Sequence, residues 1–198
     1  MSADILNLDG QKVSTNEMGE LVMRKSSIGL TKSLWNDDKR YIDNYWSVIK
    51  DYWVHGDLAS RDADGHWYLH GRSDDTIKVS GKRIGPSELE SVIVKSGKAK
   101  EVAAVGIPDA NKGSKIILSI VPAENNDQKE SFFEDLVIKD LGKSFKPDKV
   151  IFVKDLPKTR NMKIMRRVIK SCLANQDPGD LSTLLNPESI EEIRSHAI

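Results

Sequence analysis

The sequence has a single cysteine, Cys172, among its 198 residues. One cysteine excludes an internal disulfide and a zinc site built from several thiolates, and it favours a reducing compartment. No apolar run approaches the roughly 20 residues that span a bilayer, and the polar first residues are unlike a signal peptide. We therefore expect a cytoplasmic protein with no membrane partner.

The sequence also has no net charge. Thirty basic and thirty acidic residues balance to a formal charge of zero, so no overall field favours nucleic acid. The basic stretch at 158–167 lacks interleaved exposed aromatics, and we expect no nucleic-acid partner there either. The four histidines show no metal-ligand spacing with other candidate ligands, which predicts structural or surface roles and leaves any metal ligand unknown. Nucleophile-elbow and Walker-type phosphate motifs are absent too, so a complete active site is not evident.

Short apolar runs bounded by glycine, proline and asparagine indicate an α+β fold. We expect strands at 5–8, 20–24, on both sides of the Asp64-Gly65 turn, and at 76–80, 101–107, 115–121 and 150–153. Helices are expected after a cap at Asn36, from Pro86 to near Gly97, around 132–137, from about Lys163 to Leu173, and from Pro187, where proline suits a first helical position.

Two regions are expected, with a boundary at 72/73. Residues 1–72 are predicted to be a β-rich subdomain, and residues 73–198 a compact α+β domain. The first region has few aliphatic residues and several aromatics that need cover, so we interpret it as part of a larger body. A helical face of Tyr41, Tyr45 and Trp46 suggests a partner surface.

An aspartate and an arginine are the first candidates for chemistry, and the two strands around the Asp-Gly turn are expected to deliver them close together. Asp57 follows Gly56, where a carboxylate can grip a vicinal diol such as a ribose; a turn-capping role is the alternative. Arg72 follows Gly71 and offers a planar fork for phosphate or ribose oxygens; a surface ion pair is the alternative.

Two basic segments follow. Ser80 and Gly81 stand beside Lys82 and Arg83, which suits the passage of a thin phosphate-bearing chain, although spacing alone favours a hairpin glycine with solvated neighbours. The loop at 157–163 opens a helix with further cations at 166, 167 and 170. Anion binding and a solvated face are both open for that loop.

Four motifs in order resemble the AMP-forming acyl-CoA synthetases, a group within the adenylate-forming superfamily, and the acetyl-CoA synthetases among them. They are Trp53-Val-His-Gly-Asp57-Leu, the segment from Gly71-Arg72-Ser-Asp74-Asp to Glu90, the run Leu156-Pro-Lys-Thr-Arg160-Asn-Met-Lys163-Ile-Met-Arg-Arg167, and the tail Gly179-Asp-Leu-Ser-Thr-Leu184. The resemblance covers nearly the whole chain. It implies the last β-subdomain of a large AMP-binding domain at 1–72 and a small lid domain at 73–198.

The resemblance also implies a reaction. A small carboxylate attacks the α-phosphate of ATP to give an acyl-adenylate and pyrophosphate, the lid rotates, and the thiol of CoA displaces AMP. ATP/AMP, CoA and Mg²⁺ are the implied cofactors.

Residue roles follow from the same resemblance. Asp57 would bind the ribose hydroxyls, Arg72 the ribose and phosphates, and Arg83 the nucleotide side of the site. The implied hinge is Asp74. Ser80 and Gly81 would line the path of the CoA pantetheine arm. The catalytic residue would be Lys163, which bridges the carboxylate and the α-phosphate during adenylation.

The sequence departs from the family at three positions. Met162 stands where relatives have glycine before the catalytic lysine, and it is expected to stiffen the loop. Ile138 replaces an arginine associated with the CoA phosphate, with Lys139 beside it. Ser96 replaces a histidine associated with magnesium.

The family's phosphate loop, adenine motif and acyl pocket are not found in residues 1–198. We expect a chain supplying that AMP-binding domain as a partner, and no activity without it. The alternatives are a non-catalytic remnant or regulatory binding module that keeps the lid fold, or a piece cut from a longer enzyme.

Overall fold

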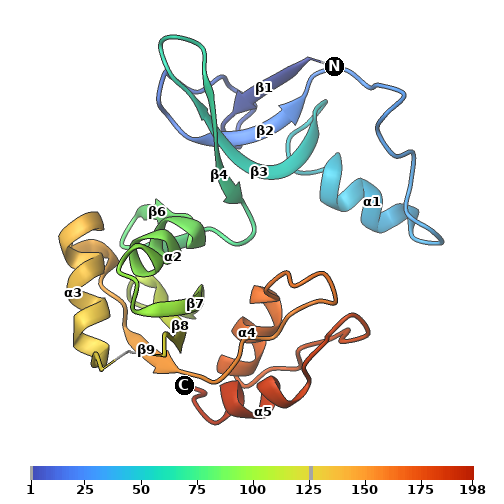
Figure 1. The fold of residues 1–198 in the computed structure, drawn as a ribbon. Coiled ribbons are helices and arrows are strands. Elements are labelled where there is room, and N and C mark those ends of the chain that lie inside the picture. Colours follow the sequence, from blue (N-terminus) through green and yellow to red (C-terminus); the bar gives the residue numbers. More distant parts are fainter. Residues whose placement is uncertain (1, 125–126) are drawn as a thin grey trace. The chain divides into compact units, whose positions relative to one another are not determined.

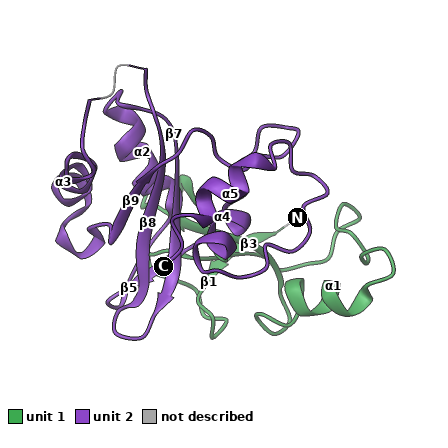
Figure 2. Cartoon of the chain, turned by 90° about the horizontal axis from the view of Figure 1, so that it is seen from below, with its two compact units in different colours: residues 1–74 green, residues 75–198 purple. Residues whose placement is uncertain are grey.

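The computed structural model describes residues 2–124 and 127–198 (Figure 1). The chain divides into two compact units, Met1–Asp74 and Asp75–Ile198 (Figure 2). The sequence-based boundary at 72/73 lies two residues before this division. Helices and strands are mixed in the chain, and the α+β class is confirmed. None of the helices in the described ranges has the length and apolar character needed to cross a membrane.

The first unit is a four-stranded antiparallel sheet with one helix. Its strands are β1 (Ala3–Leu6), β2 (Gly19–Met23), β3 (Trp53–Arg61) and β4 (Trp67–Arg72), in that spatial order, and its helix is α1 (Asp38–Tyr45). The strands predicted at 5–8 and 20–24 are therefore present, with β1 beginning at Ala3 instead of residue 5. The β3–β4 hairpin encloses the expected Asp-Gly turn and pairs Asp57 with Arg72.

Two expectations for α1 were wrong. Its N-cap is Asp37, whose carboxylate accepts a hydrogen bond from the Arg40 amide at 3.1 Å, while Asn36 lies outside the helix with a left-handed φ of 53°. The expected exposed aromatic face is also absent, because Tyr41 is buried and Tyr45 stacks on Trp53 at 5.2 Å between ring centroids. The helix uses these rings to cover β3.

The second unit is a three-stranded sheet between two pairs of helices. Strand β7 (Ala99–Asp109) runs antiparallel to β8 (Gly113–Pro122), and β8 runs parallel to β9 (Lys149–Phe152). Figure 2 shows α2 (Pro86–Lys95) and α3 (Glu130–Leu141) on one side of this sheet, with α4 (Arg166–Leu173) and α5 (Glu188–Arg194) on the other. A hairpin of β5 (Ile77–Val79) and β6 (Lys82–Ile84) and a short 3-10 helix, η1 (Lys143–Phe145), complete it.

Alternation along β8 explains why its β-branched run is almost continuous. Ile116, Leu118 and Ile120 belong to the core under α2 and α3, whereas Ile117 and Val121 belong to the core under α4 and α5. A strand whose two faces are both covered needs apolar residues at consecutive positions. The sheet is therefore the rigid centre from which the loops of this unit project.

Helix α4 begins at Arg166, three residues after the expected start at Lys163. The chain before it is a hydrogen-bonded loop in which Lys158 and Ile164 form an antiparallel bridge. The inner face of this helix includes Val168 and Cys172, which are fully buried. Burial also raises the pKa of the Cys172 thiol.

Candidate functional site

The first candidate site lies at the end of the β3–β4 hairpin. Arg72 Nη1 is 3.5 Å from Asp57 Oδ1 and 3.2 Å from the carbonyl oxygen of His55, and its Nε donates to Asp74 Oδ1 at 3.1 Å. The second Asp57 oxygen lies 2.9 Å from His55 Nδ1. Two carboxylates and one backbone carbonyl thus surround the guanidinium, and Asp57 and Arg72 lie close together, as the turn between the two strands predicted.

Gly56 allows this arrangement by its conformation and by its lack of a side chain. Its φ is +82°, a left-handed value that glycine adopts without strain. A Cβ placed there would lie 2.7 Å from Arg72 Nη2, closer than nonbonded atoms approach. The guanidinium therefore passes directly over the Gly56 backbone.

Charge balance keeps this arginine fully ionised. Burial lowers the pKa of Arg72, but the hydrogen bond to Asp74 and the attraction of Asp74 and Asp57 outweigh it, so the net shift is upward. The Asp57 side chain is 21% exposed and the Arg72 side chain 46%. Each carboxylate oxygen can accept more than one hydrogen bond, so Asp57 retains capacity for a polar ligand such as a diol.

The Ser80–Gly81 pair is the turn of the β5–β6 hairpin, as spacing alone predicted. Both residues have left-handed φ values, 49° and 80°, typical of a two-residue type I′ turn. A Cβ at Gly81 would meet no atom within 4 Å, so the turn faces open space. Arg83 is exposed on β6, and the neighbouring Lys82 ammonium donates to Ser144 Oγ at 3.1 Å.

Lys163 lies on an exposed loop between β9 and α4. The loop is closed by a bond from the Thr159 amide to the Lys163 carbonyl at 2.9 Å and by one from the Met165 amide to the Pro157 carbonyl at 2.8 Å. The Lys163 amide also donates to Thr159 Oγ1 at 3.2 Å. No partner for its ammonium is found in ranges 2–124 and 127–198. The loop therefore fixes the backbone and leaves the charge available.

Met162 has a strained backbone conformation in this loop. Its φ is +61°, in the left-handed region that disfavours residues with a Cβ, and its side chain is exposed. The sequence predicted a stiffer loop at this position; the structure adds a backbone strain at Met162 that the sequence did not indicate. A glycine would adopt the same φ without strain.

Sequence reasoning missed two ion-pair clusters that hold the ends of the loop. Arg166 binds the carboxylate of Glu90 on α2 through Nε at 2.8 Å and Nη2 at 2.6 Å, which raises the pKa of Arg166. The ammonium of Lys158 lies 2.7 Å from both Glu101 Oε2 and Asp155 Oδ1. The Arg166–Glu90 and Lys158–Glu101 pairs join residues far apart in sequence, and no local pattern indicates them.

The cations expected on the outer face of α4 do not form an anion-binding set. Arg166 is held by Glu90, and the guanidinium of Arg167 donates to the carbonyls of Pro178 and Asp180. Only Lys170 of the three is exposed without a contact among the described residues. The guanidinium of Arg167 instead ties the tail to α4.

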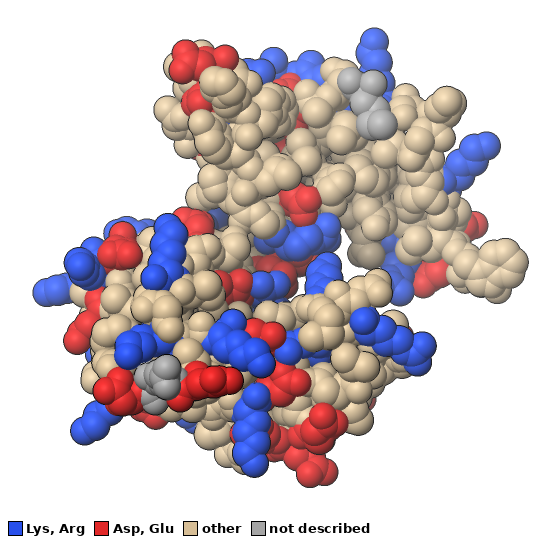
Figure 3. Space-filling view, viewed as in Figure 1, with Lys and Arg blue, Asp and Glu red and all other residues tan. Residues whose placement is uncertain are grey.

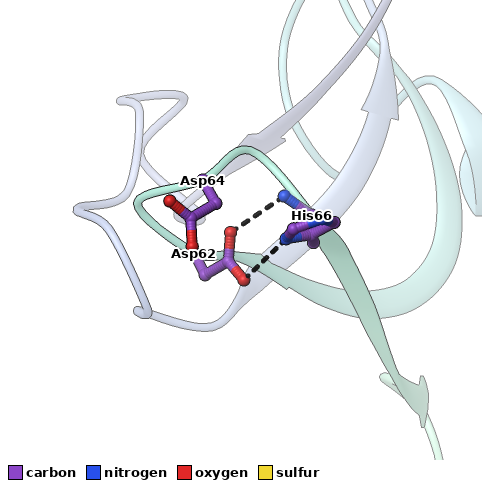
Figure 4. A group of neighbouring side chains, drawn as sticks. All are labelled: Asp62, Asp64 and His66. Atoms are coloured by element: carbon purple, nitrogen blue, oxygen red, sulfur yellow. Dashed lines mark hydrogen bonds and ion pairs between the residues drawn. The ribbon is translucent and has the colours of Figure 1, made fainter.

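A further group of polar side chains lies at the turn of the β3–β4 hairpin (Figure 4). Asp62, Asp64 and His66 bring ligand atoms within 4.8 Å of one another, a proximity that the sequence spacing did not indicate. Asp62 is nevertheless occupied: its carboxylate accepts bonds from the His66 amide at 2.9 Å and the Tyr68 hydroxyl at 2.9 Å. We interpret these hydrogen bonds as stabilising the turn of the hairpin.

The candidate residues thus fall into three groups. Asp57, Arg72 and Asp74 meet within the first unit; Ser80, Gly81 and Arg83 share a hairpin of the second unit; Lys163 stands on its own loop. Basic and acidic side chains are interspersed over the visible face in Figure 3. The functional roles assigned to these residues remain predictions.

Comparisons with known proteins bear on these groups. Residues 88–163 match the family described as AMP-binding enzyme C-terminal domain. The acetyl-coenzyme A synthetase of Methanothrix thermoacetophila is 39% identical over 97% of this chain, and the propionate–CoA ligase of Escherichia coli is 35% identical over 98%. The chain spans 30% and 32% of those two proteins.

Solved structures agree on the fold. The acetoacetyl-CoA synthetase of Streptomyces lividans matches 98% of this chain and 30% of its own with a TM-score of 0.85 at 22% identity. An anthranilate CoA ligase, AuaEII, matches 82% of this chain and 31% of its own with a TM-score of 0.69 at 26% identity. Residues 88–163 therefore belong to the AMP-binding enzyme C-terminal domain family, and nearly the whole chain matches the C-terminal part of AMP-forming acyl-CoA synthetases.

Proposed function

We propose that residues 1–198 form the lid and part of the nucleotide grip of an acyl-CoA synthetase that acts on a small carboxylate. In the first step a carboxylate oxygen attacks the α-phosphorus of ATP and pyrophosphate leaves. In the second step the CoA thiol attacks the acyl carbonyl and AMP leaves. The observation that carries the proposal is the Lys163 loop, which fixes a backbone turn while leaving an ammonium unpaired within the described ranges.

Lys163 is the catalytic residue of the first step. Negative charge accumulates between the carboxylate and the α-phosphate as the new bond forms, and a positioned ammonium stabilises that charge. A flexible four-carbon stem on a fixed turn lets the charge reach the reacting atoms and leave afterwards. The hydrogen bonds between Thr159 and Lys163 supply the fixed part.

Three residues are proposed as nucleotide contacts. Asp57 accepts hydrogen bonds from the ribose hydroxyls, while Arg72, held over Gly56, contacts ribose and phosphate oxygens. Arg83, which is exposed on the β5–β6 hairpin, is the third proposed contact. An arginine already bordered by two carboxylates is oriented before the ligand arrives, which lowers the entropy lost on binding.

The CoA step uses the same lid in another orientation, with Asp74 as the hinge. The Ser80–Gly81 turn lies against open space, so a thin pantetheine arm can run along it. Ile138 offers no charge to the CoA phosphate, and the exposed Lys139 beside it takes that role.

Magnesium is assigned to no residue of this chain. At the position that the resemblance links to the metal, Ser96 has a hydroxyl that donates to the Ile93 carbonyl at 2.6 Å and accepts from the Lys98 amide at 3.2 Å. This side chain closes helix α2 and does not fit a metal ligand. Any magnesium in the reaction would come with the nucleotide.

The adenine site and the acyl pocket come from a region outside these 198 residues, on the same polypeptide or on a partner chain. Support for this comes from the first unit, whose core cluster contains only Leu6, Val22, Ile49 and Val54 among the described residues. Exposed Ile28 and Trp35 in the same unit are large apolar side chains that such a region would cover.

A non-catalytic binding module is the second candidate. The strained Met162 and the uncharged Ile138 favour it, because both depart from the family at positions tied to catalysis or CoA. In this case the chain would bind nucleotide through Asp57 and Arg72 without turning over. The experiment below separates the two.

The test is a chimera in which this chain replaces the matching part of the Methanothrix acetyl-coenzyme A synthetase. We expect acetate-dependent exchange of pyrophosphate into ATP and then acetyl-CoA formation. Lys163→Ala should lower the exchange roughly 10²- to 10³-fold, the scale of removing one transition-state charge partner. It should spare thioester formation from preformed acetyl-adenylate.

Lys170→Ala is the matched control, because Lys170 is an exposed lysine on the adjacent helix. It should leave both half-reactions unchanged. A chimera that binds ATP but exchanges no pyrophosphate would support the binding module. Equal loss of both half-reactions in Lys163→Ala would contradict the role given to Lys163.

A further inference from the structure

The stem of the Lys163 loop is bound on both sides of its backbone by the C-terminal tail. The Lys158 amide donates to Asn186 Oδ1 at 3.0 Å, and the Leu185 amide donates to the Lys158 carbonyl at 2.8 Å. Thr159 and Leu184 extend this pairing as an antiparallel bridge. A segment 28 residues further along the chain therefore acts as a short strand against the stem.

Side chains strengthen the same junction. The ammonium of Lys158 is buried between Glu101 on β7 and Asp155, and the amide of Asn186 donates to Asp155 Oδ2 at 2.7 Å and to the Leu156 carbonyl at 2.9 Å. Burial lowers the pKa of Lys158, but its two carboxylate partners outweigh burial and leave the pKa raised. Lys158 therefore stays charged.

We propose that Asn186 and Lys158 are positioning residues that hold the Lys163 loop in the shape needed for adenylation. Neither residue contacts a reacting group; both act through the loop backbone. The part of the inference that concerns catalysis rests on the proposed function. The part that concerns the shape of the loop does not.

The connection from this junction to Lys163 is short. Lys158 precedes Thr159, whose amide and hydroxyl both bind the backbone of Lys163, and the Met165 amide returns to Pro157. A displacement of about 1 Å in a catalytic group can cost roughly 10²-fold in rate. The Lys163 side chain is flexible, so the position of its ammonium depends on the loop backbone. A loosened loop would place the ammonium near the reacting atoms less often.

The loop shape is tested by hydrogen exchange on the 198-residue chain. Asn186→Ala should raise exchange at the Thr159 and Met165 amides about 5- to 10-fold relative to the wild type, the scale of one lost hydrogen bond. Leu185→Ala is the matched control, because its side chain is exposed while its backbone bond to Lys158 remains. It should leave those amides unchanged.

The criterion is the ratio of exchange in the loop to exchange in β8. A selective rise at Thr159 and Met165 supports the proposal, and equal increases in the loop and in β8 contradict it. Two further variants keep the size of the residues. Asn186→Asp replaces the donor facing Asp155 by a repelling oxygen, and Lys158→Met removes the ammonium. Unchanged loop exchange in both would overturn the inference.

The catalytic part is tested in the chimera. Asn186→Ala should lower pyrophosphate exchange about 10- to 100-fold while leaving the KM for ATP and thioester formation from preformed acetyl-adenylate unchanged. A general loss of structure would lower both half-reactions together and would contradict the positioning role. If the wild-type chimera itself exchanges no pyrophosphate, the proposed function fails. The ratio of hydrogen exchange in the loop to that in β8 still decides the inference about the loop shape.

Discussion

The two units of this chain differ in how much apolar surface each covers by itself. The second unit has two core clusters, one on each face of its sheet, each with fourteen buried side chains among the described residues. The first unit has one cluster of four, and it exposes large apolar side chains such as Ile28 and Trp35. Burial of apolar area is the main driving force of folding, so the second unit holds most of the stability.

This difference bears on what each unit can do. The lid role proposed for the second unit requires a body that keeps its shape as it moves, and a sheet covered on both faces meets that requirement. The small core of the first unit supports the proposal that a region outside these residues covers its apolar side chains. The predictions below test that division, beginning with the largest effect.

Separating the units at Asp74 and Asp75 should give the clearest contrast. Residues 75–198 should fold alone and unfold cooperatively on heating, because their sheet is covered on both faces. Residues 1–74 should show no cooperative transition, since a small unit with a thin core is marginal. Circular dichroism during heating measures both. A sharp transition in residues 1–74 alone would break the comparison.

Single side chains should repeat the contrast inside the intact chain. Phe133 is fully buried in the second unit, with edge contacts to Phe132 and Phe152, and Phe133→Ala should cost about 3–5 kcal/mol of unfolding free energy. Trp35 is 93% exposed in the first unit, and Trp35→Ala should change it by less than about 0.5 kcal/mol. Urea denaturation followed by circular dichroism gives both values. Similar losses would mean that Trp35 is covered in solution.

Gly56→Ala tests the arginine site of the first unit. The substitution combines left-handed strain of about 1–2 kcal/mol with displacement of the Arg72 guanidinium from its place over the backbone. Gly65→Ala is the matched control, because Gly65 has a similar φ of +88° and nothing within 4 Å of the added Cβ. In the chimera, only Gly56→Ala should raise the KM for ATP. Equal effects of the two substitutions on the KM would contradict a role of Arg72 in nucleotide binding.

Met162→Gly tests the lysine loop of the second unit and should have the smallest effect, with the opposite sign. Removing a Cβ at φ +61° relieves strain, while the freer unfolded chain takes back part of the gain, leaving up to about 1 kcal/mol of added stability. Arg160→Gly, at a loop position without positive φ, should instead destabilise by about 0.5–1 kcal/mol. Thermal unfolding compares the two. Destabilisation by Met162→Gly would show that its side chain holds the loop.

Much of the fold could be predicted from local pattern. The β-branched runs gave β7 and β8, and the Asp-Gly turn gave the hairpin that brings Asp57 beside Arg72. Turn chemistry and strand alternation act over a few residues, so they can be read from sequence. The same is true of the Ser80–Gly81 turn, where the simpler interpretation matched the structure.

The errors arose where tertiary contacts decide. Helix α4 begins at Arg166 because the preceding residues form hydrogen bonds across the loop, and no local pattern in the sequence indicated those bonds. The Glu90–Arg166 pair joins residues 76 positions apart, and no local pattern predicts it. Asn186 looked like an ordinary residue before a proline.

The buried thiol of Cys172 has a practical consequence. Because it is the only cysteine in the sequence and its side chain has no exposed surface, alkylating reagents and maleimide dyes should bypass the folded chain. A second cysteine introduced at Arg160, beside the lysine loop, would then take up a fluorophore alone. Because the native cysteine stays unlabelled, fluorescence from the introduced site would report movement of the loop.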